Sequence, residues 1–89
     1  MRAFITVLGK DTVGILAKVS TACAEENISI LEVTQSVLQD IFVMIMLVDM
    51  DNATKTISQM QEKFDVLGEK TNLKIHIMHE DIFNSMHRI

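Results

Sequence analysis

The chain has 89 residues, of which 48% are hydrophobic and 22% are charged, and its formal net charge at pH 7 is −4. A chain of this length forms one domain, and its acidic balance excludes the concentrated basic face that nucleic-acid binding requires. Its single cysteine, Cys23, excludes a disulfide within the chain. We expect a cytoplasmic protein, because no signal-peptide pattern begins the sequence and the longest apolar run, residues 41–48, is too short to span a bilayer.

The first half of the chain predicts a strand, a helix and a second strand. Residues 2–8 are β-branched or aromatic and end at Gly9, as a strand would. Asp11 or Thr12 is expected to cap the following helix, which ends at Asn27, a residue that tolerates the left-handed conformation. The helix has apolar residues at helical spacing, namely Ile15, Leu16, Val19, Ala22 and Cys23. Residues 28–38 predict the second strand.

The second half predicts a hairpin, a helix, a last strand and a tail. A tight turn at Gln39 and Asp40 leads into a third strand over residues 41–48. An amphipathic helix follows, with Gly68 near its C-terminal cap and apolar residues at Ala53, Ile57, Met60, Phe64 and Leu67. Residues 72–79 predict a fourth strand. We therefore expect an α+β, ferredoxin-like βαββαβ domain over residues 1–79 and a short amphipathic tail helix within residues 80–89.

Both faces of this four-stranded antiparallel sheet are predicted to be apolar, whereas its two helices can cover only one face. Phe4 and Leu8 alternate with the residues that face the helices, and Met44 and Met46 lie on the third strand. We therefore expect a Met- and Phe-rich open face, which monomers seldom expose. The tail helix and a second subunit are the expected covers, and we predict a homodimer.

The turn from the first strand into the first helix is the best candidate binding site. The first backbone N–H groups of a helix have no partner within it, and the helix dipole favours an anion there. N–H groups near Val13, Gly14 and Ile15 suit a carboxylate, and the carboxylate of Asp11 suits an ammonium group. An amino acid carries both groups. The alternative is that Asp11 only caps the helix and Gly14 only packs closely.

Catalysis has little support in the sequence, and we expect no enzyme, cofactor or metal. Cys23 lies on the apolar stripe of its helix, as a packing residue would. His76 and His79 are an odd number of residues apart on a strand, which points them to opposite faces. A small hydrolase, including a phosphatase, is the least favoured alternative, because the first loop offers Lys10 and no arginine.

The motif G-x-D-x-x-G-I-L-A-K-V-S at residues 9–20, followed by A-E-E-N-I-S-I-L-E-V-T-Q at residues 24–35, resembles the ACT domain, a regulatory module of amino-acid metabolism. The chain is similar to single-ACT bacterial proteins of the UPF0237 type, which are related to the glycine cleavage repressor family. The resemblance implies amino-acid or small-metabolite binding and side-by-side pairing of two domains. Many amino-acid-binding members carry a proline where this chain has Val13.

Carried over position by position, the resemblance implies a ligand site that two subunits share. Asn27 and Ile28 match the start of the second strand, from which an asparagine reaches the partner's ligand in many ACT domains. Gln35 lies further along that strand. The complete set of implied ligand-binding residues is Lys10, Asp11, Thr12, Val13, Gly14, Ile15, Asn27, Ile28 and Gln35.

The sequence supports two functional hypotheses, one for a ligand-binding protein and one for a protein–protein adaptor. The first is a homodimeric sensor that binds an amino acid and thereby changes its affinity for another protein. The second is a ligand-free protein–protein adaptor that uses the Met-rich open sheet face. No catalytic or DNA-binding sequence accompanies the ACT-like pattern, so we do not expect a complete allosteric enzyme.

Overall fold

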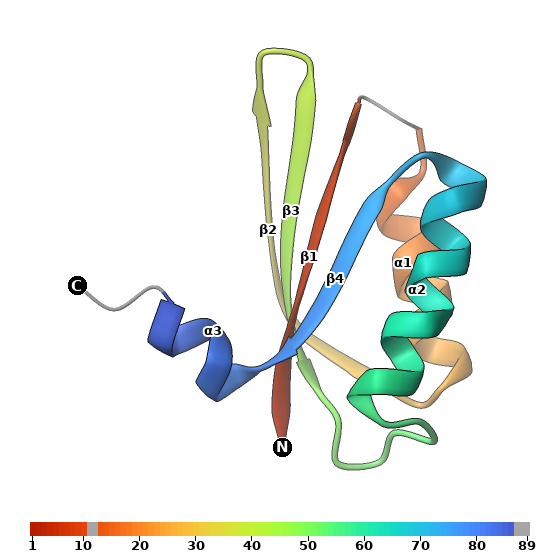
Figure 1. The fold of residues 1–89 in the computed structure, drawn as a ribbon, viewed down its shortest axis with the longest axis vertical. Coiled ribbons are helices and arrows are strands. Elements are labelled where there is room, and N and C mark those ends of the chain that lie inside the picture. Colours follow the sequence, from red (N-terminus) through yellow and green to blue (C-terminus); the bar gives the residue numbers. More distant parts are fainter. Residues whose placement is uncertain (11–12, 87–89) are drawn as a thin grey trace.

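The computed structural model describes residues 1–10 and 13–86, which form one sheet with helices on both of its faces (Figure 1). The element order confirms the predicted βαββαβ arrangement with a short C-terminal helix. The elements are β1 (Arg2–Lys10), α1 (Ile15–Glu25), β2 (Ser29–Leu38), β3 (Ile41–Asp49), α2 (Ile57–Thr71), β4 (Lys74–His79) and α3 (Glu80–Met86). The four strands are antiparallel to their neighbours and lie in the order β2-β3-β1-β4.

The hydrophobic core lies between the sheet and the two longer helices. As predicted, Ala3, Ile5 and Val7 of the central strand β1 face the helices, and all three are fully buried. The register places Ile5 opposite Met46 and Val7 opposite Met44, so these methionines point to the same side. The helices complete the core with buried side chains that include Val19, Cys23, Met60 and Phe64.

The expectation of a Met-rich open face is wrong. Met44 and Met46 are fully buried in the core, because their cross-strand partners on β1 face the helices. The opposite face of β3 instead carries Val43, Ile45 and Leu47, which are half-buried. The open face is therefore apolar, as expected, but mainly aliphatic.

Helix α3 covers part of this open face, on the side of the sheet opposite α1 and α2 (Figure 1). The ring of Phe83 stacks on that of Phe4 with 4.0 Å between the ring centroids. Arg2 and Glu80 form an ion pair at the base of the helix. Ile82 and Met86 remain 54% and 65% exposed, so the helix buries one face only. The tail helix thus contributes to covering the sheet, as predicted.

Two left-handed residues determine where α1 begins and ends. Gly14, with φ 80°, occupies the N-cap, so the expectation that Asp11 or Thr12 would occupy it is wrong. Asp11 and Thr12 themselves lie outside the described residues. Asn27, with φ 59°, follows the helix as predicted. The N–H of Asn27 donates to the Ala24 carbonyl and that of Ile28 to the Cys23 carbonyl, which is the Schellman arrangement.

Helix α2 begins later and ends later than expected. It starts at Ile57 because Thr56 and Gln59 form a reciprocal capping box, in which each side chain bonds to the other's backbone N–H. It continues to Thr71 and ends at Asn72, another left-handed residue. Gly68 therefore lies inside the helix and not near its cap as predicted. A Cβ atom at Gly68 would lie 2.4 Å from the Leu73 carbonyl oxygen, so this position requires the absence of a side chain.

We predict that Gly68→Ala destabilises the protein by about 1–3 kcal/mol, because the added methyl meets backbone that cannot move aside freely. Helix propensity alone would favour alanine by about 1 kcal/mol, so the two effects have opposite signs. Urea denaturation of both proteins measures the difference. The exposed neighbour Glu69 offers a control, since Glu69→Ala should change the free energy of unfolding little. An increase in stability for Gly68→Ala would contradict this packing.

Candidate functional site

Three backbone segments meet at one end of the sheet: the end of β1, the start of α1 and the β2–β3 hairpin (Figure 1). The register fixes this proximity, because Gly9 lies opposite Phe42, which in turn lies opposite Val37. Lys10 ends β1 and is exposed. The predicted ligand loop therefore lies beside a projecting hairpin, which the sequence analysis did not anticipate.

The first turn of α1 offers backbone donors that are paired with no residue among 1–10 and 13–86. The carbonyl of Gly14 accepts the first helical hydrogen bond from the Lys18 N–H, at 3.0 Å. The N–H groups of Ile15, Leu16 and Ala17 precede this bond and so have no acceptor within the helix. The glycine N-cap has no side chain to satisfy any of them. This turn has the polarity that a carboxylate requires.

The side chains of the predicted loop differ in what they present to solvent. Val13 is 94% exposed, whereas Ile15 is only 3% exposed and belongs to the core. The Ile15 side chain therefore anchors the helix, and only its backbone N–H remains for the predicted role. The proposed roles of Asp11 and Thr12 rest on the sequence, because both residues lie outside the described part of the chain.

Gln35 lies on the same side of the sheet as α1. It pairs with Met44, whose side chain faces the helices, and the Gln35 Nε2 atom lies 3.9 Å from the Met44 Sδ atom. Val37 shares this face and is 64% exposed, because the hairpin extends past the helices. Phe42, opposite Val37, is half-buried. The exposed amide and these apolar groups form a wall beside the start of α1.

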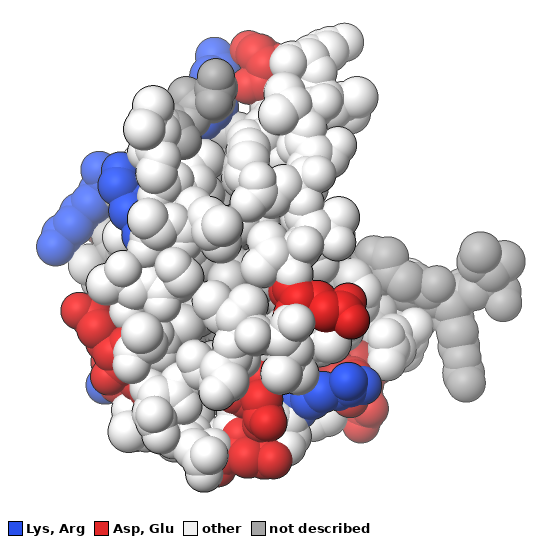
Figure 2. All heavy atoms as spheres, turned by 180° about the vertical axis from the view of Figure 1, so that it is seen from behind, with Lys and Arg blue, Asp and Glu red and all other residues white. Residues whose placement is uncertain are grey.

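Val37 and Phe42 are site candidates that the sequence analysis missed. The signal was present, because Gln35 and Val37 are two residues apart on a strand and must share a face. Charged side chains lie mostly toward the margins of the molecule in Figure 2, which leaves a broad uncharged surface between them.

Asn27 and Ile28 lie at the opposite end of α1 from Gly14, about 16 Å away for a helix of 11 residues. The Asn27 Nδ2 atom donates to the Asn52 carbonyl oxygen at 3.0 Å. Ile28 is 5% exposed and belongs to the core. One chain therefore does not bring Asn27 or Ile28 to the loop, and only a second chain could do so.

The two edges of the sheet are protected unequally. On β4, the side-chain amide of Gln61 pairs with the backbone, donating to the Ile75 carbonyl and accepting from the Ile77 N–H, both at 2.9 Å. On the other edge, almost every residue of β2 is exposed. A long edge strand of this kind can pair with another strand.

An ion-pair cluster joins α1 to α2 at the end remote from the loop. Lys63 Nζ lies 2.7 Å from the Glu26 carboxylate and 2.9 Å from that of Glu25, and Thr54 donates to Glu26 at 2.6 Å. Hydrogen bonds from Lys63 and Thr54 lower the pKa of Glu26. Partial burial opposes the charge of Lys63, but its bonds to Glu26 and Glu25 outweigh this and raise its pKa. The cluster stabilises the helix layer and is remote from the candidate site.

We predict that Glu26→Gln lowers the free energy of unfolding at pH 7 and that this difference disappears in acid. A lowered pKa means that folding favours the ionised carboxylate. The stabilisation is therefore complete above the ordinary glutamate pKa of about 4.3 and is lost as pH falls through the lowered value. Urea denaturation at pH 7 and at about pH 3 measures both limits. Glu62→Gln, the same change at an exposed position on α2, is the control. A difference that persists unchanged in acid would contradict the prediction.

Cys23 lacks the properties of a nucleophile. It is fully buried, and burial raises the pKa of its thiol to about 11. The reactive thiolate is thus about one part in a thousand at pH 8. Within residues 1–10 and 13–86, no three His, Cys, Asp or Glu side chains gather closely enough to hold a metal ion. The helices in those ranges all fall short of the length and hydrophobicity that a membrane span needs.

We predict that a disulfide reagent modifies Cys23 of the folded protein only as fast as the core opens, and that it modifies the unfolded protein at once. Absorbance of the released thiolate follows the reaction. A matched control is the double variant Cys23→Ser/Thr21→Cys, which moves the thiol to an exposed position on the same helix and should react rapidly when folded. Equal rates for the two folded proteins would show that Cys23 is accessible.

Comparison with known proteins agrees with this fold. The ACT-domain family matches residues 2–78. A UPF0237 protein of Clostridium perfringens is 51% identical over 89 residues, which is the full length of both chains. An ACT-domain protein of Streptococcus pneumoniae has a similar structure, with a TM-score of 0.83 and 37% identity over 93% of each chain.

A glycine cleavage system transcriptional repressor shares the fold at 20% identity, with a TM-score of 0.71 over 86% of this chain and 44% of that one. The family match and the full-length relative together confirm the resemblance inferred from the loop and from the start of β2. The chain belongs to the ACT-domain family and, within it, to the UPF0237 proteins.

Proposed function

We propose that this protein is a homodimeric regulatory module that binds an amino acid, or a similar small carboxylate, at the start of α1 and thereby changes its affinity for another protein. The observation that carries the proposal is the juxtaposition of unpaired N–H groups at Gly14–Ala17 with the exposed amide and apolar groups of the β2–β3 hairpin. ACT domains are typically regulatory modules that bind small molecules, and the family assignment supports the same function.

The two halves of the site suit the two ends of an amino acid. The N–H groups of Ile15, Leu16 and Ala17 would hold the carboxylate, because the positive end of the helix dipole is directed at it. The sequence assigns the ammonium group to Asp11, with Lys10 and Thr12 beside it. The exposed Val13 would border the entrance.

The hairpin would select the ligand side chain. Val37 and Phe42 offer apolar surface, and the amide of Gln35 can both donate and accept a hydrogen bond. An amide bonded weakly to a methionine sulfur, at 3.9 Å, can exchange that contact for a ligand at little cost. This wall favours a ligand with a small polar or apolar side chain.

A second copy would complete the site by pairing along the exposed edge of β2. Antiparallel pairing of two β2 strands about a twofold axis places the start of one strand beside the end of the other. Asn27 and Ile28 of one chain would then lie near Gln35 and Val37 of its partner. The Asn27 Nδ2 atom already bonds to Asn52, so its Oδ1 atom is the one left to accept from the ligand's ammonium group. The edge of β4 cannot serve equally, because Gln61 occupies it.

The adaptor hypothesis retains one supporting observation. The open sheet face carries Leu8 at 46% exposure, and the outer side of α3 carries Ile82 and Met86. The buried positions of Met44 and Met46 remove the methionines on which the original hypothesis rested. An adaptor function on this face would leave the start of α1 without a role, so we favour the ligand-binding function.

We predict that at least one of the twenty amino acids, titrated to millimolar concentration, raises the midpoint of thermal unfolding. A ligand present at 100 times its Kd stabilises the folded state by about 2.7 kcal/mol. Calorimetry measures the affinity, and NMR locates the site, because the amide signals of Ile15, Leu16 and Ala17 should shift most. Sedimentation measures whether the binding species is a dimer. No response to any amino acid would contradict the amino-acid version of the proposal.

Two neighbouring residues of β2 provide a matched pair of variants for this prediction. Gln35→Ala removes the amide on the helix-facing side and should weaken binding, as should Asp11→Ala. Thr34→Ala alters the opposite face, where Thr34 pairs with Ile45, and should leave the affinity unchanged. Equal effects of Gln35→Ala and Thr34→Ala would place the ligand elsewhere.

A further inference from the structure

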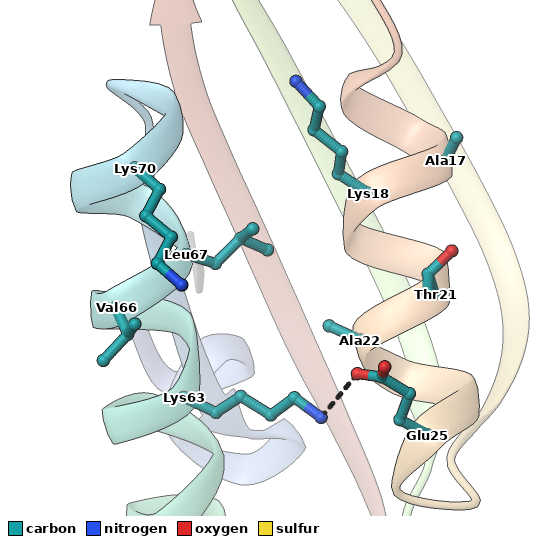
Figure 3. A pocket seen from close by; sticks show the side chains of 9 residues that line it. All are labelled: Ala17, Lys18, Thr21, Ala22, Glu25, Lys63, Val66, Leu67 and Lys70. Atoms are coloured by element: carbon teal, nitrogen blue, oxygen red, sulfur yellow. Dashed lines mark hydrogen bonds and ion pairs between the residues drawn. The ribbon is translucent and has the colours of Figure 1, made fainter.

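The outer surface of the helix layer contains a groove between α1 and α2, with a volume of about 450 Å³ (Figure 3). Its floor is formed by the buried Ala22 and the half-buried Leu67. Ala17 and Thr21 form one wall, and the exposed Val66 belongs to the other. Small residues on α1 keep this wall low, so the groove is open along its length to another molecule.

The charges around the groove are predominantly positive. Three of the eight Lys and Arg residues of this acidic chain border it, together with one acidic residue, Glu25. Glu25 is already paired with Lys63, at 2.9 Å. Lys18 and Lys70 form no ion pair with any described residue. In Figure 3 these two lysines border the end of the groove opposite the Glu25–Lys63 pair.

The spacing of the lining residues suits a third helix. On α1 the groove is lined at positions 17, 18, 21, 22 and 25, and on α2 at positions 63, 66, 67 and 70. Each wall therefore presents one helical face, and the helix rises by about 10 Å between positions 18 and 25 and between positions 63 and 70. An amphipathic helix that lays its apolar side into such a groove makes contacts at intervals of three and four residues. About two turns of such a helix would fit between the walls.

We propose that the α1–α2 groove is a docking site for an acidic amphipathic helix of a partner protein. The helix's apolar side chains contact Ala22, Leu67 and Val66, and its carboxylates pair with Lys18 and Lys70. Charge complementarity selects this occupant, because an apolar helix with basic flanks would meet two uncompensated lysines at one end of the groove. The site lies apart from the hairpin wall, so docking does not require that an amino acid bind.

The helix α3 of a second copy is the competing occupant, since it has acidic residues in its first turn and exposes Ile82 and Met86. Its Phe83 is stacked on Phe4 and its Glu80 is paired with Arg2, so α3 is already committed to its own sheet. Because α3 is committed in this way, Lys18 and Lys70 favour a separate protein as the occupant of the groove.

The test uses the isotopically labelled full chain without added amino acids and a synthetic helix-stabilised peptide. The peptide is about 14 residues long, with leucines on one side and glutamates beside them, so that it exceeds the two turns that the groove contacts. Addition of the peptide should shift the amide signals of Ala17, Thr21 and Leu67 in NMR spectra. Lys18→Glu and Lys70→Glu should each weaken the peptide affinity by about tenfold, because each reversal replaces attraction with repulsion.

Two controls make the result decisive. Lys74→Glu reverses an exposed lysine on β4, outside the groove, and should leave the affinity unchanged. The same peptide with lysines in place of its glutamates should bind much more weakly to the native chain. Equal binding of both peptides, shifts confined to the open sheet face, or equal loss with Lys74→Glu would each overturn the proposal. Concentration-dependent shifts at the groove without peptide would identify a second copy as the occupant and overturn it too.

Discussion

The register between β1 and β3 determines which side chains enter the core and which lie on the open face of the sheet. Val7 opposite Met44, and Gly9 opposite Phe42, set the face on which every residue of β3 lies. Because side chains alternate along a strand, a slip of one residue would expose Met44 and Met46 and bury the aliphatic residues of the open face. The same register carries through to β2, where it places Gln35 and Val37 on the side of α1. This one register therefore determines which residues form the core, the open face and the candidate ligand wall.

The elements could be predicted from the sequence where a local pattern was sufficient. Helical periodicity found α1 and α2, β-branched and aromatic residues ending at Gly9 found β1, and alternation found β4. Asn27 ended α1 because asparagine tolerates a positive φ. The start of α2 could also have been found, because Thr56 and Gln59 have the spacing of a capping box. Ala53, an apolar residue in the preceding loop, continued the helical pattern and obscured that signal.

What could not be predicted depended on contacts between distant segments. The face on which Met44 lies depends on the partner of its strand, since both residue sets of β3 are apolar. Gly68 looks like a helix end in the sequence, but the close approach of Leu73 explains it instead. Likewise, Gly14 takes the N-cap because a left-handed residue is needed there, although Asp11 and Thr12 are the better capping residues.

The unequal edges of the sheet explain why the candidate site is open on one side. Gln61 uses both ends of its amide to occupy the backbone of β4, so a strand could add there only by displacing it. No such side chain is seen to pair with the outer edge of β2 within the described residues, and Gln35 and Val37 on this strand stay exposed. A site that borders a free strand edge is half-enclosed in a single chain. Hydrogen bonds between a ligand and the polar groups of this site would therefore be strongest when a second strand, paired along the same edge, excludes water.

Helix α1 connects the two surfaces for which we propose functions. Its first turn supplies N–H groups that precede the first helical hydrogen bond, and the groove begins at Ala17 and Lys18 in that same stretch of helix. A ligand that preferred one position of this turn would also favour one separation between Lys18 on α1 and Lys70 on α2 if α1 moved as a rigid unit. If the docked helix prefers the same separation, thermodynamic linkage requires that the partner tighten ligand binding by the same factor by which the ligand tightens docking. Regulation by a domain of this size then needs only a small shift of one helix whose two ends are fixed by Gly14 and Asn27.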